Sequence, residues 1–220
     1  MPKKGPERKL PTFAGLQNLV NLRQVEFYFY QGSLMFAAWQ DGHDIENISK
    51  LKEHIDSCPF AWKSIPALLN FRSICYFILD RNAQAARGLQ TKIKSIVKKT
   101  GVEWYYSDAF LLAYQGKFKE GLQAYRRAFK MEAPLPLPVE IETFIVWTLQ
   151  NEPEKIQFHF FLGLINYRVK NDRISANADF ETFLKLAVDP QYQELVGEAT
   201  KAIEELALTE QNTLDLYATH

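Results

Sequence analysis

The chain has 220 residues, carries 26 Lys and Arg against 26 Asp and Glu, and is 47% hydrophobic with two cysteines. These values exclude a disordered tail protein, a collagen and a small domain held together by disulfides. The length suffices for one large core or one continuous array of repeats, and the one abnormal number is an aromatic content of 14%.

The N-terminal stretch, Met-Pro-Lys-Lys-Gly-Pro-Glu-Arg-Lys, lacks the apolar segment of a secretory signal. We therefore expect a disordered basic arm over 1–13 and a cytoplasmic protein. The two thiols, Cys58 and Cys75, have no metal-ligand spacing and fit buried, inert roles in a reducing compartment. The strongest apolar run, Val25 to Trp39, contains polar residues and is too short for a bilayer, so we expect no membrane insertion.

Helical periodicity dominates from Ala14 onward, and no run alternates for long in the manner of a β-strand. The predicted elements are helices joined by short turns. They cover, in chain order, 16–39, 45–55, 62–79, 86–99, 104–114, 118–131, 139–149, 153–169 and 177–187, followed by a last amphipathic helix that carries Leu195 to Leu206.

Several boundaries have local signals. Asp44 can cap the second helix, and Gly101 follows the fourth helix as a glycine C-cap would. Gly116 lies in the turn between the fifth and sixth helices, and Pro153 fits the first turn of the eighth. The proline-rich segment 133–138 cannot be helical, so we expect an extended, polyproline-like strap.

The recurrence of helix, short turn and helix predicts an all-α fold with about 10 or 11 helices. First helices of successive pairs recur at intervals of roughly forty to fifty residues, which favours a solenoid of stacked antiparallel hairpins over a closed bundle. We expect this repeat domain over 14–208 and a C-terminal tail over 209–220.

One stretch carries a spaced set of bulky and small residues. In order these are Tyr105, Ala109, Gly116, Phe118, Gly121, Tyr125, Ala128 and Pro134. This pattern resembles a tetratricopeptide (TPR) repeat, and 158–190, with Leu162-Gly163 and Asp189-Pro190, is similar to a second one. The resemblance implies a right-handed α-solenoid built from degenerate TPR-like repeats.

The sequence contains no constellation for catalysis. The histidines His43, His54, His159 and His220 form no HExxH motif, and the glycines form no phosphate-binding loop. We therefore expect a protein that is not an enzyme and that has no metal and no cofactor.

In a TPR array the first helices line a concave groove. The resemblance transfers this groove to Glu103, Tyr106, Phe110, Tyr114, Gln157, Phe160, Tyr167 and Arg168. Exposed aromatic residues there would anchor a peptide or a segment of another protein, as in an adaptor, scaffold or assembly factor. The alternative is that half of them are interhelical core. Phe110 and Leu164 replace the polar side chains with which some family members clamp a terminal carboxylate.

The charges are unevenly distributed, with a basic middle and an acidic end. Arg87, Lys94 and Lys98 would form a basic face that could contact nucleic acid, although the neutral total and the acidic end disfavour this partner. A homo-oligomer is a third alternative, in which the acidic last helix packs on the basic fourth helix of a neighbouring copy.

Overall fold

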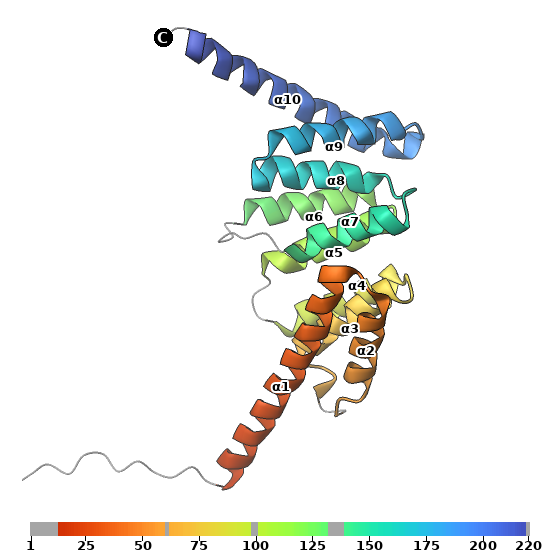
Figure 1. The fold of residues 1–220 in the computed structure, drawn as a ribbon, viewed down its shortest axis with the longest axis vertical. Helices are drawn as coiled ribbons and strands as arrows, with labels where there is room; N and C mark the ends of the chain where they lie inside the picture. Colours follow the sequence, from red (N-terminus) through yellow and green to blue (C-terminus); the bar gives the residue numbers. More distant parts are fainter. Residues whose placement is uncertain (1–12, 60–61, 98–100, 132–138, 219–220) are drawn as a thin grey trace, which may run out of the picture. The chain divides into compact units, whose positions relative to one another are not determined.

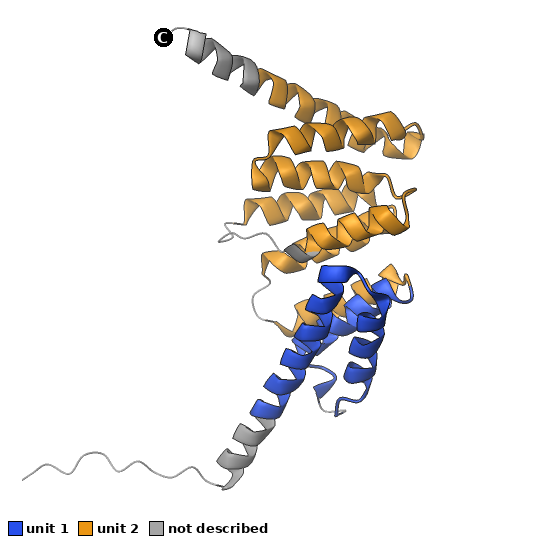
Figure 2. Cartoon of the chain, viewed as in Figure 1, with its two compact units in different colours: residues 1–80 blue, residues 81–220 orange. Residues whose placement is uncertain are grey.

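The computed structural model describes residues 13–59, 62–97, 101–131 and 139–218, and of residues 13–22, 139–140 and 209–218 only the backbone. The described residues contain ten α-helices and no β-strand (Figure 1), which confirms the predicted all-α class. The chain forms two compact units, Met1–Asp80 and Arg81–His220 (Figure 2). The predicted basic arm falls on 1–12 and the predicted proline strap on 132–138, both outside the described residues.

Unit 1 consists of a long helix, α1 (Phe13–Gly42), followed by α2 (Ile45–Asp56) and α3 (Pro66–Ile78). Asp44 caps α2 as predicted, because its side chain accepts a hydrogen bond from the backbone N–H of Glu46 at 2.9 Å. The buried face of α2 carries Ile48, Leu51 and Ile55.

The core of unit 1 forms where α1 packs on α2 and α3. Gly32 allows this approach, because a Cβ at this position would lie 2.8 Å from the ring of Phe71 on α3. Phe36 and Trp39, which follow on the same side of α1, are also buried. One face of α1 is thus fixed against its own unit.

Unit 2 contains the remaining elements, in which each helix packs on a neighbour in the sequence. They are α4 (Ala83–Ile96), α5 (Val102–Tyr114), α6 (Phe118–Lys130), α7 (Val139–Asn151), α8 (Gln157–Ile165), the π-helical turn η2 (Asn166–Lys170), α9 (Arg173–Leu186), the short 3-10 turn η3 (Pro190–Tyr192) and α10 (Gln193–Ala218).

The two hairpins that carry the TPR resemblance, α5–α6 and α8–α9, are both present. Gly116 adopts a φ of 76°, the left-handed conformation that the predicted turn requires. A Cβ at Gly121 would lie 3.2 Å from the carbonyl oxygen of Ala109, and one at Gly163 would lie 2.8 Å from the ring of Phe180. Small residues therefore let the paired helices approach closely, as predicted for Ala109 and Gly121.

Four predicted helix boundaries are wrong. The helix predicted over 177–187 is α9, which begins four residues earlier, at Arg173. The third helix begins at Pro66 rather than at Trp62, because proline lacks the N–H that a helix interior needs and fits the first helical position. Gly101 is not the C-cap of α4, which ends at Ile96, but the N-cap of α5 with extended backbone. Pro153 precedes α8 in a turn that the hydrogen bond from Lys155 N to Glu152 O closes at 2.9 Å.

The backbone of α10 continues as a helix to Ala218, through most of the stretch 209–220 that was predicted as a tail. Leu195, Ala199, Ala202 and Leu206 are buried on its inner side as predicted. Asn171 adopts a left-handed conformation and Asp172 caps α9, so the predicted turn between α8 and α9 is confirmed.

Candidate protein-interaction surface

Four of the predicted groove residues are buried in the core of unit 2. Tyr106, Phe110, Gln157 and Phe160 have relative exposures of 4%, 3%, 2% and 0%. The expectation that they line an open groove is therefore wrong, and the alternative that half of the set is interhelical core holds.

Contacts from neighbouring helices explain this burial. Phe110 on α5 stacks on Phe158 of α8 with ring centroids 4.9 Å apart, and Phe144 of α7 lies 5.8 Å away. Tyr106 meets Tyr125 of α6 edge-on at 5.9 Å, and burial raises the pKa of its phenol to about 12. The aromatic rings therefore join the helices of unit 2 to each other.

Tyr114, at the end of α5, is half-buried and is held by its own unit. Its hydroxyl donates to Glu152 at 2.7 Å, and burial, then this hydrogen bond, raise its pKa. Lys155 lies 4.4 Å from the centre of its ring. The side chain of Arg81 approaches the other carboxylate oxygen of Glu152 at 3.2 Å. This cluster ties α5 to the turn before α8.

Tyr167 and Arg168 lie on the π-turn η2 and both contact α10. The Tyr167 hydroxyl donates to Glu205 at 3.0 Å, and Arg168 donates to the same carboxylate oxygen at 2.8 Å. Glu103 is exposed in the first turn of α5, where a carboxylate stabilises the helix N-terminus. The eight predicted residues thus do not form one open surface, because parts of unit 2 occupy their contacts.

The predicted basic face is partly neutralised within unit 2. Arg87 on α4 donates to Asp108 of α5 at 2.6 Å. Lys94 lies 4.1 Å from the ring centre of Trp104, whose indole N–H donates to the carbonyl of Gln90 at 2.8 Å. Lys98 lies outside the described residues. Two of the three predicted cations therefore have partners in their own unit.

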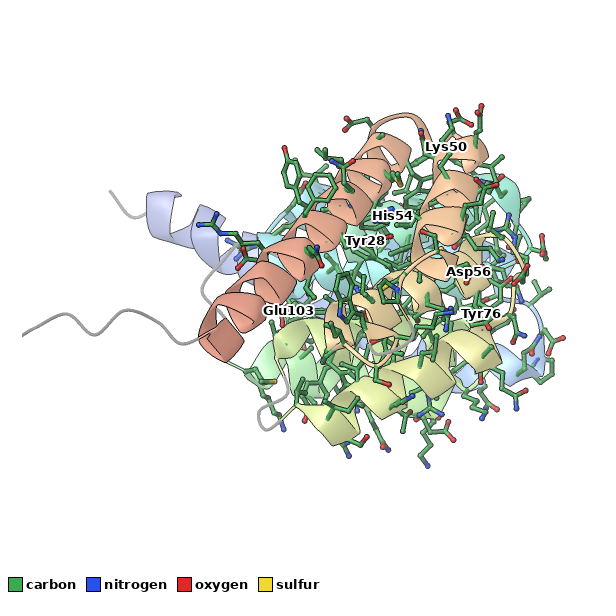
Figure 3. The ribbon with its side chains drawn as sticks, turned by 90° about the horizontal axis from the view of Figure 1, so that it is seen from below. Tyr28, Lys50, His54, Asp56, Tyr76 and Glu103 are labelled. Carbon is green, nitrogen blue, oxygen red and sulfur yellow. The ribbon has the colours of Figure 1, made fainter. Side chains whose placement is uncertain are left out.

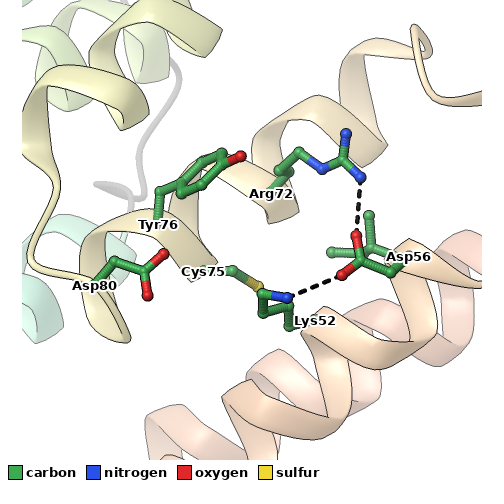
Figure 4. A pocket seen from close by; sticks show the side chains of 7 residues that line it. Lys52, Asp56, Arg72, Cys75, Tyr76 and Asp80 are labelled. Atoms are coloured by element: carbon green, nitrogen blue, oxygen red, sulfur yellow. Dashed lines mark hydrogen bonds and ion pairs between the residues drawn. The ribbon is translucent and has the colours of Figure 1, made fainter.

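Unit 1 has a polar pocket of about 200 Å³ between α2 and α3 (Figure 4). Asp56 accepts from Lys52 and from Arg72, both at 2.9 Å, and these hydrogen bonds lower its pKa. Burial raises the pKa of the Cys75 thiol, which also lines the pocket, to about 12, so the reactive thiolate is suppressed at neutral pH. Lys52, Asp56 and Arg72 thus pair with each other, and Asp80 is a further carboxylate in the lining of the pocket.

Within the described part of the chain, no group of three His, Cys, Asp or Glu side chains is placed to hold a metal ion. None of the helices that the structure describes combines the length and the apolar character needed to cross a membrane.

Among the residues whose side chains the structure describes, α1 carries the largest group of exposed bulky apolar side chains. Phe27 is 60% exposed, Tyr30 59% and Leu34 47%. These positions follow one another at intervals of three and four residues, so they share one face of the helix. We call this row, Phe27, Tyr30 and Leu34, the α1 face. It lies opposite Gly32 and Trp39, which face the core of unit 1.

A pocket of about 510 Å³ adjoins the α1 face at Phe27. Tyr28 of α1, which lines this pocket, stacks on His54 of α2 with ring centroids 4.5 Å apart (both residues are labelled in Figure 3) and meets Trp62 edge-on at 5.5 Å. The His54 ring also bonds to the backbone carbonyl of Tyr28 at 3.0 Å. The residues that line the pocket are Arg23, Gln24, Phe27, Tyr28, Pro59 and Trp62.

The sequence analysis assigned Phe27 and Tyr30 to a long helix but not to a binding surface. The signal that could have found them is the spacing of the row, which repeats every seven residues at Arg23, Tyr30 and Ala37 and again at Phe27 and Leu34. Bulky side chains that recur every seven residues along one face are typical of a helix that pairs with another helix.

No protein-family model, no curated protein and no solved structure matches this chain. Its function must therefore be inferred from its own residues.

Proposed function

We propose that this chain is a non-enzymatic protein-interaction module, an adaptor or assembly subunit, and that the α1 face is its binding surface. The observation that carries the proposal is the uncovered row of Phe27, Tyr30 and Leu34 on a helix whose opposite side is fixed in a core. Contiguous exposed apolar residues mark protein interaction sites, and aromatic side chains contribute most to such interfaces.

The geometry around the α1 face suits binding. Its neighbouring pocket has an aromatic lining and one cationic side chain, Arg23, at the rim. In this lining Tyr28 is held by its stack on His54, so little conformational freedom of this ring is lost when a partner binds. This combination of an apolar surface and a polar rim fits a helical or extended protein segment better than it fits a nucleic acid.

For unit 2 we propose a scaffold of stacked TPR-like hairpins with the right-handed course that the family has. Close helix approach at Gly121 and Gly163 supports it. Further support comes from Phe110 on Phe158 and Tyr125 on Phe161, stacks that join the hairpin α5–α6 to the first helix of the hairpin α8–α9. In this proposal the binding surface lies outside the repeat groove, whose aromatic residues serve the core.

Affinity purification with matched variants tests the binding surface. The α1 variant, Tyr30→Glu/Leu34→Glu, places charges on the α1 face, and Ile174→Glu/Val188→Glu places them on apolar residues of unit 2 that are 84% and 89% exposed. We expect the α1 variant to lose the proteins that the wild type retains from its native cell extract, and the control to keep them. Equal capture by all three proteins, with equal helicity by circular dichroism, would contradict the proposal.

A further inference from the structure

The α1 face continues as a seven-residue repeat beyond its three exposed members. Positions 16, 20, 23, 27, 30, 34 and 37 alternate steps of four and three residues, and the sequence places Leu, Val, Arg, Phe, Tyr, Leu and Ala there. Such a row is the seam of a two-stranded coiled coil. The helix that carries it has 30 residues and is ~45 Å long, which is sufficient for several repeats.

The spacing of the seam allows two copies of the helix to pair antiparallel in register. If two copies of α1 cross antiparallel with the two-fold axis at Val25, Arg23 of one copy lies opposite Phe27 of the other. In the same register Tyr30 and Leu34 lie opposite positions 20 and 16, where the sequence has Val and Leu. Two of the three opposing pairs are then apolar or aromatic on both sides, and the third places Arg23 against the Phe27 ring.

The charges at the centre of the seam agree with this register. Arg23 and Glu26 are both exposed, and neither forms an ion pair within the described part of the chain. In the antiparallel register each Arg23 comes next to Glu26 of the other copy and can also lie over its Phe27 ring. A parallel pair would instead place the two Arg23 side chains against each other, which disfavours it.

We propose that the partner of the α1 face is a second copy of this chain, bound as an antiparallel helix pair centred on Val25. This inference rests on the proposed function, because it names the occupant of the same surface. The interface is isologous: the same residues of both copies contribute to it. It differs from a contact between the acidic last helix and α4, since Glu198 and Glu205 on α10 pair with Arg126 and Arg168 of their own unit.

Sedimentation velocity of the purified full-length protein over a range of concentrations tests the self-association. We expect a reversible monomer–dimer equilibrium whose dissociation constant rises at least ~100-fold in the α1 variant Tyr30→Glu/Leu34→Glu, because each dimer then places carboxylates opposite the apolar residues at positions 20 and 16. The control Ile174→Glu/Val188→Glu should dimerise like the wild type. A wild type that stays monomeric at all concentrations overturns the inference, as does a dimer that the α1 variant leaves intact.

Cross-linking with single cysteine substitutions tests the register. Gln24→Cys places thiols of the two copies close to the two-fold axis, whereas Leu34→Cys places them ~27 Å apart along the helix pair. The native Cys58 and Cys75 are buried and outside disulfides. A short bismaleimide should therefore link Gln24→Cys into dimers and leave Leu34→Cys unlinked. Efficient linking of Leu34→Cys, with or without linking of Gln24→Cys, would indicate a parallel pair and overturn the antiparallel register.

Failure of this inference and failure of the proposed function are distinguishable. If the purified protein is monomeric but the α1 variant still loses the captured proteins, the partner is a different protein and only the inference is overturned. If the α1 variant changes neither self-association nor capture, both are overturned.

Discussion

His159 on α8 shows how one position in the core of unit 2 couples stability to pH. The side chain is half-buried among the aromatic residues that join the hairpins, and burial lowers its pKa below the ordinary 6.5. As the pH falls, the His159 imidazole therefore becomes protonated in the unfolded chain at a higher pH than in the folded chain. The contribution of neutral His159 to the free energy of unfolding is therefore fully present above pH 6.5. It is lost as the pH falls below that value.

Replacement of this residue tests the coupling. Between about pH 7 and pH 5.5, where His but not Asp or Glu titrates in unfolded chains, we expect the free energy of unfolding of the wild type to fall more steeply than that of His159→Gln. Urea unfolding at a series of pH values measures both slopes. Parallel slopes would show that the protonation of His159 does not differ between the folded and unfolded states.

At the scale of helices, local sequence signals predicted several helix ends correctly. They failed at residues whose type fits two different structural positions. Asp44 accepts an N-terminal N–H bond of α2 as predicted, and Gly116 adopts the conformation that glycine favours. The cap of α9, Asp172, was not predicted, and the start of this helix was placed at 177. Gly101 was misassigned because a glycine between two helices can close one or open the next. Pro153 was misassigned because proline fits the first turn of a helix and the second position of a β-turn equally well.

Two glycines inside helices should respond in opposite ways to the same substitution. A Cβ at Gly163 would meet the ring of Phe180, which is fully buried and cannot move away, so we expect Gly163→Ala to destabilise unit 2 by about 1–3 kcal/mol. A Cβ at Gly197 on α10 meets nothing within 4 Å, so Gly197→Ala should stabilise the helix by about 0.5–1 kcal/mol. Chemical denaturation measures both changes. Stabilisation by Gly163→Ala would mean that α8 and α9 are not in close contact.

At the scale of the whole molecule, the class of fold could be predicted from the sequence and the binding surface could not. Periodicity shows that a helix has an apolar face, but not which neighbour covers it. Phe110 was expected in a groove and is covered by Phe144 of α7, a helix that lies between the hairpins α5–α6 and α8–α9 in the sequence. Tyr167 and Arg168 were expected there as well, and α10 occupies their polar contacts through Glu205.

The same reasoning explains why the α1 face was missed. Phe27 and Tyr30 are of residue types that are common in protein cores. Only the burial of Gly32, Phe36 and Trp39 shows that the core of unit 1 lies on the other side of α1. The aromatic excess in the composition thus serves two purposes. Many rings join helices within a unit, and Phe27 and Tyr30 remain exposed on α1, where we propose that a partner binds.

Photo-cross-linking in the native cell tests the central claim most directly. A photoreactive phenylalanine analogue at position 30 lies on the α1 face, and the same analogue at position 174 lies on an exposed apolar position elsewhere. If the α1 face binds a protein, irradiation should yield a discrete adduct from position 30, with either a second copy of the chain or another protein, and little from position 174. Equal yields from both positions, or no adduct from position 30, would contradict the assignment of the α1 face as the interaction surface.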